Sequence, residues 1–77
     1  MKSIKMILGG KEVAKITENS FEEKLQRHPY GFNLVNLYDA CFYGMHLNTF
    51  DERYEAVKEG SYFCYQKPSL KLEAAES

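Results

Sequence analysis

Apolar and polar residues alternate over residues 3–8, as they do in a strand that packs one face against a core. Three apolar side chains share that face: Ile4, Met6 and Leu8. Gly9 and Gly10 follow directly, and paired glycines supply the positive φ angles that a tight hairpin turn requires. We therefore expect residues 11–17 to form the returning strand of a β-hairpin.

The returning strand departs from strict alternation. Val13 and Ile16 lie three positions apart, so an unbroken strand would place their side chains on opposite faces. We expect a β-bulge or a change of facing near Ala14 and Lys15.

The next segment has the signature of a helix start. Ser20, followed three residues later by Glu23, matches a capping box, in which each side chain bonds a free backbone N–H at the helix end. Three residues then follow helical spacing: Phe21, Leu25 and His28. Pro29 disfavours helical backbone at the residue before it, so this pattern predicts a short helix that ends at His28.

A second helix is expected over residues 33–44. Its apolar stripe has the spacing of one helix face and consists of Leu34, Leu37, Tyr38, Cys41 and Met45. Gly44 offers a left-handed stop at the C-terminal end. The same stretch is rich in residues that favour strands, such as Val35 and Tyr43, so a strand is the alternative.

A third helix begins after Thr49, because Thr49 and Glu52 repeat the capping-box spacing. Its apolar face consists of Phe50, Tyr54 and Val57. Asp51 and Glu52 fall in the first turn, where the helix dipole favours negative charge, and Gly60 closes the helix.

Residues 61–67 form an aromatic, strand-prone run that ends at Pro68. Tyr62 and Cys64 would point to one face of this strand, and Phe63 and Tyr65 to the other. We expect this strand to pair with the first strand, with pairing to the second strand as the alternative. A short edge strand over residues 70–72 is an additional expectation.

These elements predict an α+β fold with a small three-stranded antiparallel sheet, two or three helices on one face, and the order β-β-α-α-α-β. The 77 residues suit one domain, which we assign to residues 1–72, with residues 73–77 as a disordered tail.

Composition narrows the class of protein. A net charge of -1 lacks the basic excess that nucleic-acid binders usually show. The chain has no apolar stretch long enough to span a membrane and no secretory leader pattern at its start. Cys41 and Cys64 are too few for a secreted disulfide framework, so we expect reduced thiols in a cytoplasmic protein.

No pattern indicates a cofactor, a metal site or an enzyme. The candidate ligands His28, His46, Cys41 and Cys64 lack the short spacing of zinc motifs. Cys41 and His46 form the nearest Cys/His pair, but a thiol on an apolar helix stripe is usually inert.

The aromatic content carries the functional expectation. Six Tyr and five Phe make up 14% of the chain, which is more ring area than one thin core can enclose. Exposed Tyr-rich patches mark protein interfaces, because Tyr brings contact area at low entropic cost. We expect four rings in the connector and second helix to contact another protein or a second copy of this chain: Tyr30, Phe32, Phe42 and Tyr43.

The resulting hypothesis is a small non-enzymatic protein-binding module, such as a stoichiometric inhibitor. Small cofactor-free chains of this kind include phage and mobile-element proteins that block host defence enzymes, such as anti-CRISPR proteins, and the analogy rests on size alone. The alternative is a small nucleic-acid-binding regulator that stacks bases on a lysine- and aromatic-bearing sheet face. Its binding residues would be Lys5, Lys15, Lys67 and Tyr65.

Overall fold

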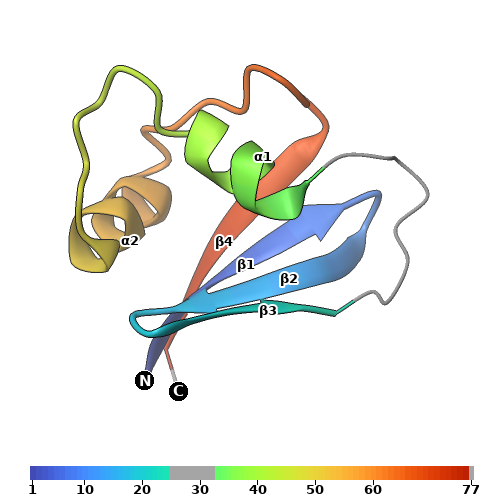
Figure 1. Cartoon of the computed structure of the whole chain (residues 1–77), viewed down its shortest axis with the longest axis horizontal. Coiled ribbons are helices and arrows are strands. Elements are labelled where there is room, and N and C mark those ends of the chain that lie inside the picture. Colours follow the sequence, from blue (N-terminus) through green and yellow to red (C-terminus); the bar gives the residue numbers. More distant parts are fainter. Residues whose placement is uncertain (25–32, 77) are drawn as a thin grey trace.

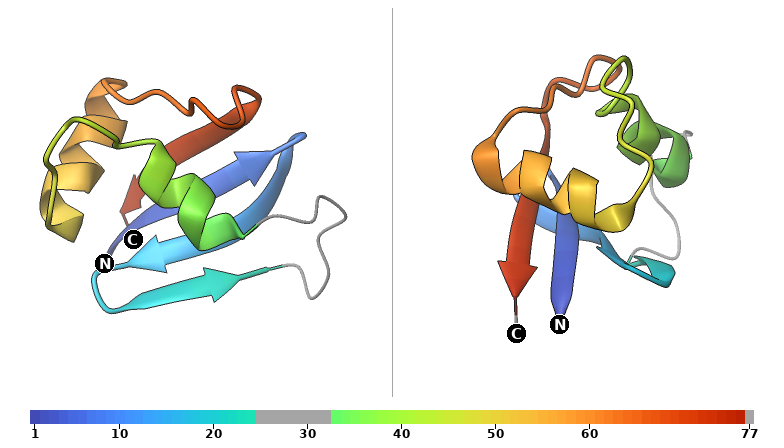
Figure 2. Two further views of the ribbon diagram at one scale, coloured as in Figure 1. Left: turned by 45° about the horizontal axis from the view of Figure 1, so that its top comes forward. Right: turned by 90° about the vertical axis from the view of Figure 1, so that its left-hand side faces the viewer.

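The computed structural model describes residues 1–24 and 33–76, which form a four-stranded antiparallel sheet and two helices (Figure 1). The elements in chain order are β1 (Lys2–Leu8), β2 (Lys11–Thr17), β3 (Ser20–Glu23), α1 (Leu34–Ala40), α2 (Phe50–Glu59) and β4 (Leu70–Glu76). The strand order is β3-β2-β1-β4, and the two chain ends lie side by side (Figure 2). The α+β class is as expected, but the sheet has four strands rather than three.

The β1–β2 hairpin confirms the first prediction. Gly9 and Gly10 have φ angles of 62° and 79°, the left-handed values that a tight turn needs. Met6 pairs with Ala14 and Ile7 pairs with Glu12, so Val13 is an extra residue in β2. This bulge lies one position before the predicted site, and it lets the successive side chains of Val13 and Ala14 both be buried.

The helix predicted from Ser20 is wrong for the described residues, because Ser20–Glu23 is strand β3. The Ser20 hydroxyl lies 2.6 Å from the Thr17 hydroxyl, so it bonds across the β2–β3 turn instead of capping a helix. Phe21 pairs with Ile16, and its ring packs edge to face on Tyr38 with the ring centroids 6.0 Å apart. These tertiary contacts outweigh the local capping pattern. The predicted helix residues Leu25 and His28 lie outside the described residues.

The last strand is also displaced from its predicted position. Residues 61–67 form turns and irregular backbone, whereas β4 runs from Leu70 to Glu76 and pairs with β1 along its length. The strand predicted over residues 61–67 is therefore wrong, whereas the short strand expected over residues 70–72 is present, continues to Glu76 and takes the place beside β1. Residues 73–76, predicted as part of a loose tail, belong to this strand, in which Glu73 lies opposite Lys5.

Both remaining predicted helices are present, although α1 ends at Ala40 and not at the expected stop, Gly44. The Asn33 side chain caps α1 by accepting the Val35 N–H at 2.8 Å, and α1 ends at Ala40. Thr49 caps α2 by accepting the Glu52 N–H at 3.2 Å, and Gly60 ends it with a φ of 76°.

The core lies between the helices and one face of the sheet. The largest fully enclosed side chains are Ile4, Met6, Leu34 and Cys41. The opposite sheet face carries a charged row across all four strands, in the order Glu22, Lys15, Lys5, Glu73. The sheet is thus apolar on one side and charged on the other, which makes the fold a two-layer arrangement.

Tyr62 fixes the segment before β4 to that strand. Its hydroxyl accepts the Leu72 N–H at 2.9 Å and donates to the Leu72 C=O at 3.0 Å. The backbone groups of Leu72 therefore point away from β1, toward the outer side of β4. One side chain satisfies both of them, which ties residues 61–67 to the edge of the sheet.

We predict that Tyr62→Phe lowers the free energy of unfolding by about 1–2 kcal/mol, because it removes both hydrogen bonds and keeps the ring. The matched control is Tyr65→Phe, since the Tyr65 side chain is 65% exposed, and its effect should stay within about 0.5 kcal/mol. Urea denaturation followed by circular dichroism measures both. Equal stabilities for the two variants would contradict the role assigned to the Tyr62 hydroxyl.

Candidate functional site

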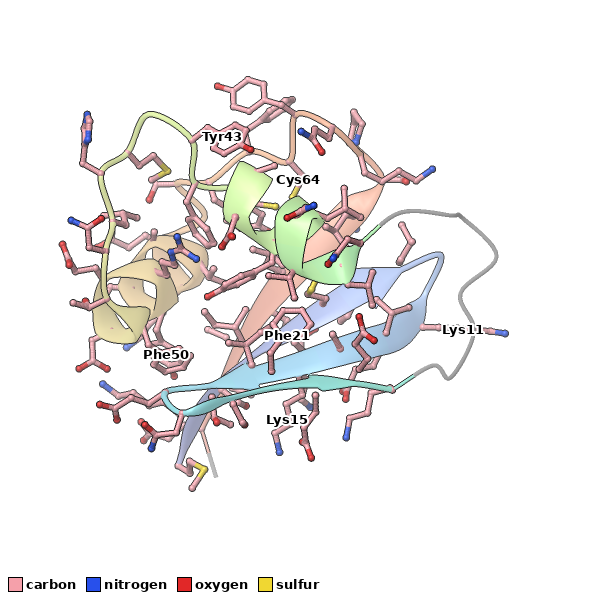
Figure 3. The ribbon with its side chains drawn as sticks, in the orientation of Figure 1. Lys11, Lys15, Phe21, Tyr43, Phe50 and Cys64 are labelled. Carbon is pink, nitrogen blue, oxygen red and sulfur yellow. The ribbon has the colours of Figure 1, made fainter. Side chains whose placement is uncertain are left out.

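Three exposed rings gather where the segment after α1 meets the segment after α2. Tyr43, Phe63 and Tyr65 are 61%, 55% and 65% exposed. The rings of Phe63 and Tyr65 pack edge to face with centroids 4.6 Å apart. Tyr43 lies at the same end of the molecule as Cys64, the residue between Phe63 and Tyr65 in the sequence (Figure 3). We call these three residues the aromatic patch.

A backbone contact beneath the patch joins the two segments. The Phe63 N–H donates to the Cys41 C=O at 3.4 Å, which brings Phe63 close to the turn that carries Tyr43. The side chains of Tyr62 and Cys64 face the core, while Phe63 and Tyr65 face outward. The exposed rings therefore stand on a backbone whose alternate side chains are anchored.

A pair of buried thiols also joins the two segments. The sulfur atoms of Cys41 and Cys64 lie 2.6 Å apart, and the Cys41 thiol also donates to the Leu37 C=O at 3.3 Å. Burial raises the pKa of both thiols above the ordinary value, and the contact with Cys64 raises that of Cys41 further. Protonated thiols in an apolar setting act as small hydrophobic groups, which suits a structural role.

Arg53 of α2 contacts the opposite side of the turn that follows α1. Its guanidinium donates to Asp39 at 2.9 Å and to the Leu47 C=O at 3.2 Å. The same group lies over the Tyr38 and Phe42 rings, 5.2 and 4.9 Å from their centroids. One side chain of α2 thus connects α1, the turn after it and the approach to α2.

The structure describes two of the four rings predicted to contact a partner. Tyr43 is exposed, but Phe42 is 4% exposed and packs against Tyr38 at 5.3 Å, so its assignment to a docking surface is wrong. Phe42 lies four residues after Tyr38, and the turns after Ala40 keep it on the buried face of α1. Tyr30 and Phe32 lie outside the described residues.

Phe63 was not among the predicted binding residues, and Tyr65 was named only for the nucleic-acid alternative, although their alternation with Tyr62 and Cys64 predicted the correct facing. Residues 61–67 were predicted to form a strand within the sheet, where both faces find neighbours. In the structure this segment lies outside the sheet, so the outward rings stay exposed. The signal was an aromatic run with rings on both faces.

The residues of the nucleic-acid alternative are not brought together. Lys5 and Lys15 are cross-strand partners on the charged sheet face, flanked in their row by Glu73 and Glu22. Tyr65 and Lys67 lie in the connection between α2 and β4, which packs beside α1. The basic pair therefore lacks an aromatic platform from this set, and its row carries no excess of positive charge.

The described residues also bear on metal and thiol chemistry. Residues 1–24 and 33–76 contain no group of three or more His, Cys, Asp or Glu side chains that could hold a metal ion. His28, one of the candidate ligands, is outside these ranges. The polar partners of the Cys41 thiol are Cys64 and the Leu37 C=O, whereas the His46 side chain is exposed.

No family model, curated protein or solved structure matches this chain. Among the helices of the described residues, none has the length and apolar character needed to cross a bilayer. Functional inference therefore rests on the surfaces themselves.

The buried thiols predict a loss of stability in alkali. Their pKa values are raised on folding, so the folded state holds its protons above pH of about 8.5, where unfolded thiols ionise. The free energy of unfolding should then fall as pH rises, by up to about 1.4 kcal/mol per pH unit for each thiol. Urea denaturation in reducing buffer between pH 8 and 10 measures this slope.

The control for this prediction is the double variant Cys41→Ala, Cys64→Ala. It should be less stable at neutral pH because it leaves a cavity, but its stability should change less over the same pH interval. An equally steep decline in the double variant would assign the effect to other groups. Tyr38, whose pKa burial also raises, contributes only where unfolded tyrosine ionises, near pH of about 10.

Proposed function

We propose that the protein is a small non-enzymatic protein-binding module whose docking surface is the aromatic patch. The observation that carries the proposal is the exposure of Tyr43, Phe63 and Tyr65 above an anchored backbone. Exposed rings at one place are unusual for a surface that faces only water, and they are enriched in the centres of protein interfaces.

The aromatic patch is held in ways that reduce the entropic cost of binding a partner. The edge-to-face packing of Phe63 on Tyr65 limits the freedom of both rings before a partner arrives. The thiol pair and the backbone bond to Cys41 restrict the segment below them. A ring held in this way loses little conformational entropy on binding, so more of its contact free energy appears as affinity.

A module of this kind suits a stoichiometric inhibitor or an adaptor, whose whole action is to occupy a surface of another protein. A second copy of the chain is the other candidate partner, because an exposed apolar patch can be self-complementary around a two-fold axis. The two cases differ in a measurable way, since only self-association changes the mass of the purified protein with concentration.

The test compares Phe63→Ala, Tyr65→Ala with the wild-type protein. Loss of hot-spot rings should weaken partner binding by tenfold or more, which corresponds to about 1.4 kcal/mol. The measurement is quantitative affinity capture from cells that naturally make the protein, together with light scattering of the purified chain across a concentration series. The control is Val35→Ala, which truncates an apolar side chain that is 40% exposed outside the patch.

Circular dichroism should show the same fold for both variants, because neither alters a buried side chain. If the ring variant retains every partner and the same mass as wild type, the patch is not a docking surface.

A further inference from the structure

A concave surface lies along α2, apart from the aromatic patch. It is an open groove of about 480 Å³ between α2 and the segment that leads into it. Met45, Leu47 and Ala56 form its apolar part, and Met45 and Leu47 are half-buried against the core. Neither Tyr43, Phe63 nor Tyr65 lines it.

The rim of this groove is acidic. The α2 residues Glu52, Glu55 and Glu59 line it at helical spacing, with Asp51 at its N-terminal end. Among the described residues, no Lys or Arg lines the groove. The Arg53 side chain of the same helix turns toward Asp39 of α1 instead. Within residues 1–24 and 33–76, neither Glu55 nor Glu59 forms an ion pair.

We infer that this groove binds a cationic amphipathic segment of a partner protein. Apolar side chains of the segment would cover Met45, Leu47 and Ala56, and its Lys or Arg side chains would lie beside Glu55 and Glu59. Charge complementarity selects this occupant, because an apolar segment with acidic flanks would bring like charges together. The inference is independent of the aromatic patch and stands if that proposal fails.

The two parts of the groove have different physical roles. The apolar part removes hydrophobic surface from water and so supplies affinity, and the unbranched Met45 side chain can adapt to different partners. The rim glutamates are exposed, where single ion pairs contribute little free energy. Their combined field instead attracts cationic segments and fixes orientation, so binding should weaken as salt rises.

The probe is a synthetic helical peptide with leucines on one face and lysines on the other. In an NMR titration of the full chain, we expect amide shifts that concentrate between residues 45 and 61. Fluorescence anisotropy should show binding that weakens by about tenfold or more in Glu55→Lys, Glu59→Lys. The neutral variant Glu55→Gln, Glu59→Gln should weaken peptide binding less than the charge reversal does. It keeps the inference testable if the reversed charges disturb α2.

The matched control is Glu22→Lys, Glu73→Lys, which changes net charge by the same amount on the opposite sheet face. Its affinity for the peptide should fall far less than that of the groove variant. A second peptide with serine in place of leucine keeps every lysine and should not bind, because it cannot cover the apolar part of the groove.

Several results would overturn the inference. They are equal weakening by the groove and sheet variants, equal binding of the serine peptide, or shifts spread over the charged sheet face. Absence of binding at low salt would do the same, as would groove shifts that depend on protein concentration alone, which would assign the groove to a second copy of the chain. Phe63→Ala, Tyr65→Ala should bind the peptide normally, so the two proposals fail separately.

Discussion

The fold depends on covering one apolar sheet face with two short helices. Neither helix is long enough to do this alone, so the turn between them must also be held in place. Arg53 stabilises this turn, because its guanidinium donates to Asp39 and to the Leu47 C=O and packs on the Phe42 ring. The buried thiol pair joins the same turn to the segment before β4. Segments with little regular structure therefore become fixed, and both proposed surfaces include residues from them.

The sequence predicted the elements whose determinants are local. The glycine pair specified the β1–β2 turn, and Thr49 with Gly60 specified both ends of α2. It failed where distant contacts decide. Ser20 has a capping pattern, yet Phe21 gains more by packing on Tyr38 and pairing with Ile16. A run of rings is strand-prone, yet the Leu70–Glu76 segment occupies the place beside β1.

Only part of the two candidate surfaces could be predicted from the sequence. The alternation that turned Phe63 outward was readable, because it follows from extended backbone whether or not a strand forms. Phe42 was predicted to be exposed and is buried, although it lies four residues after Tyr38, the spacing of one helix face. The approach of Cys41 to Cys64 joins segments 23 positions apart, and the apolar side of the groove combines α2 with the residues before it. Such convergence depends on the path of the chain between elements, which periodicity does not encode.

The Tyr62 hydroxyl also bears on how the protein can expose binding surfaces without forming open-ended aggregates. β4 is an edge strand of the sheet. Unpaired edge strands allow the sheets of separate molecules to pair edge to edge and to extend into fibrils. A phenol seated on both backbone groups of Leu72 blocks that register near the middle of the strand. Open-ended polymerisation is thereby disfavoured, while contacts through exposed side chains elsewhere stay available.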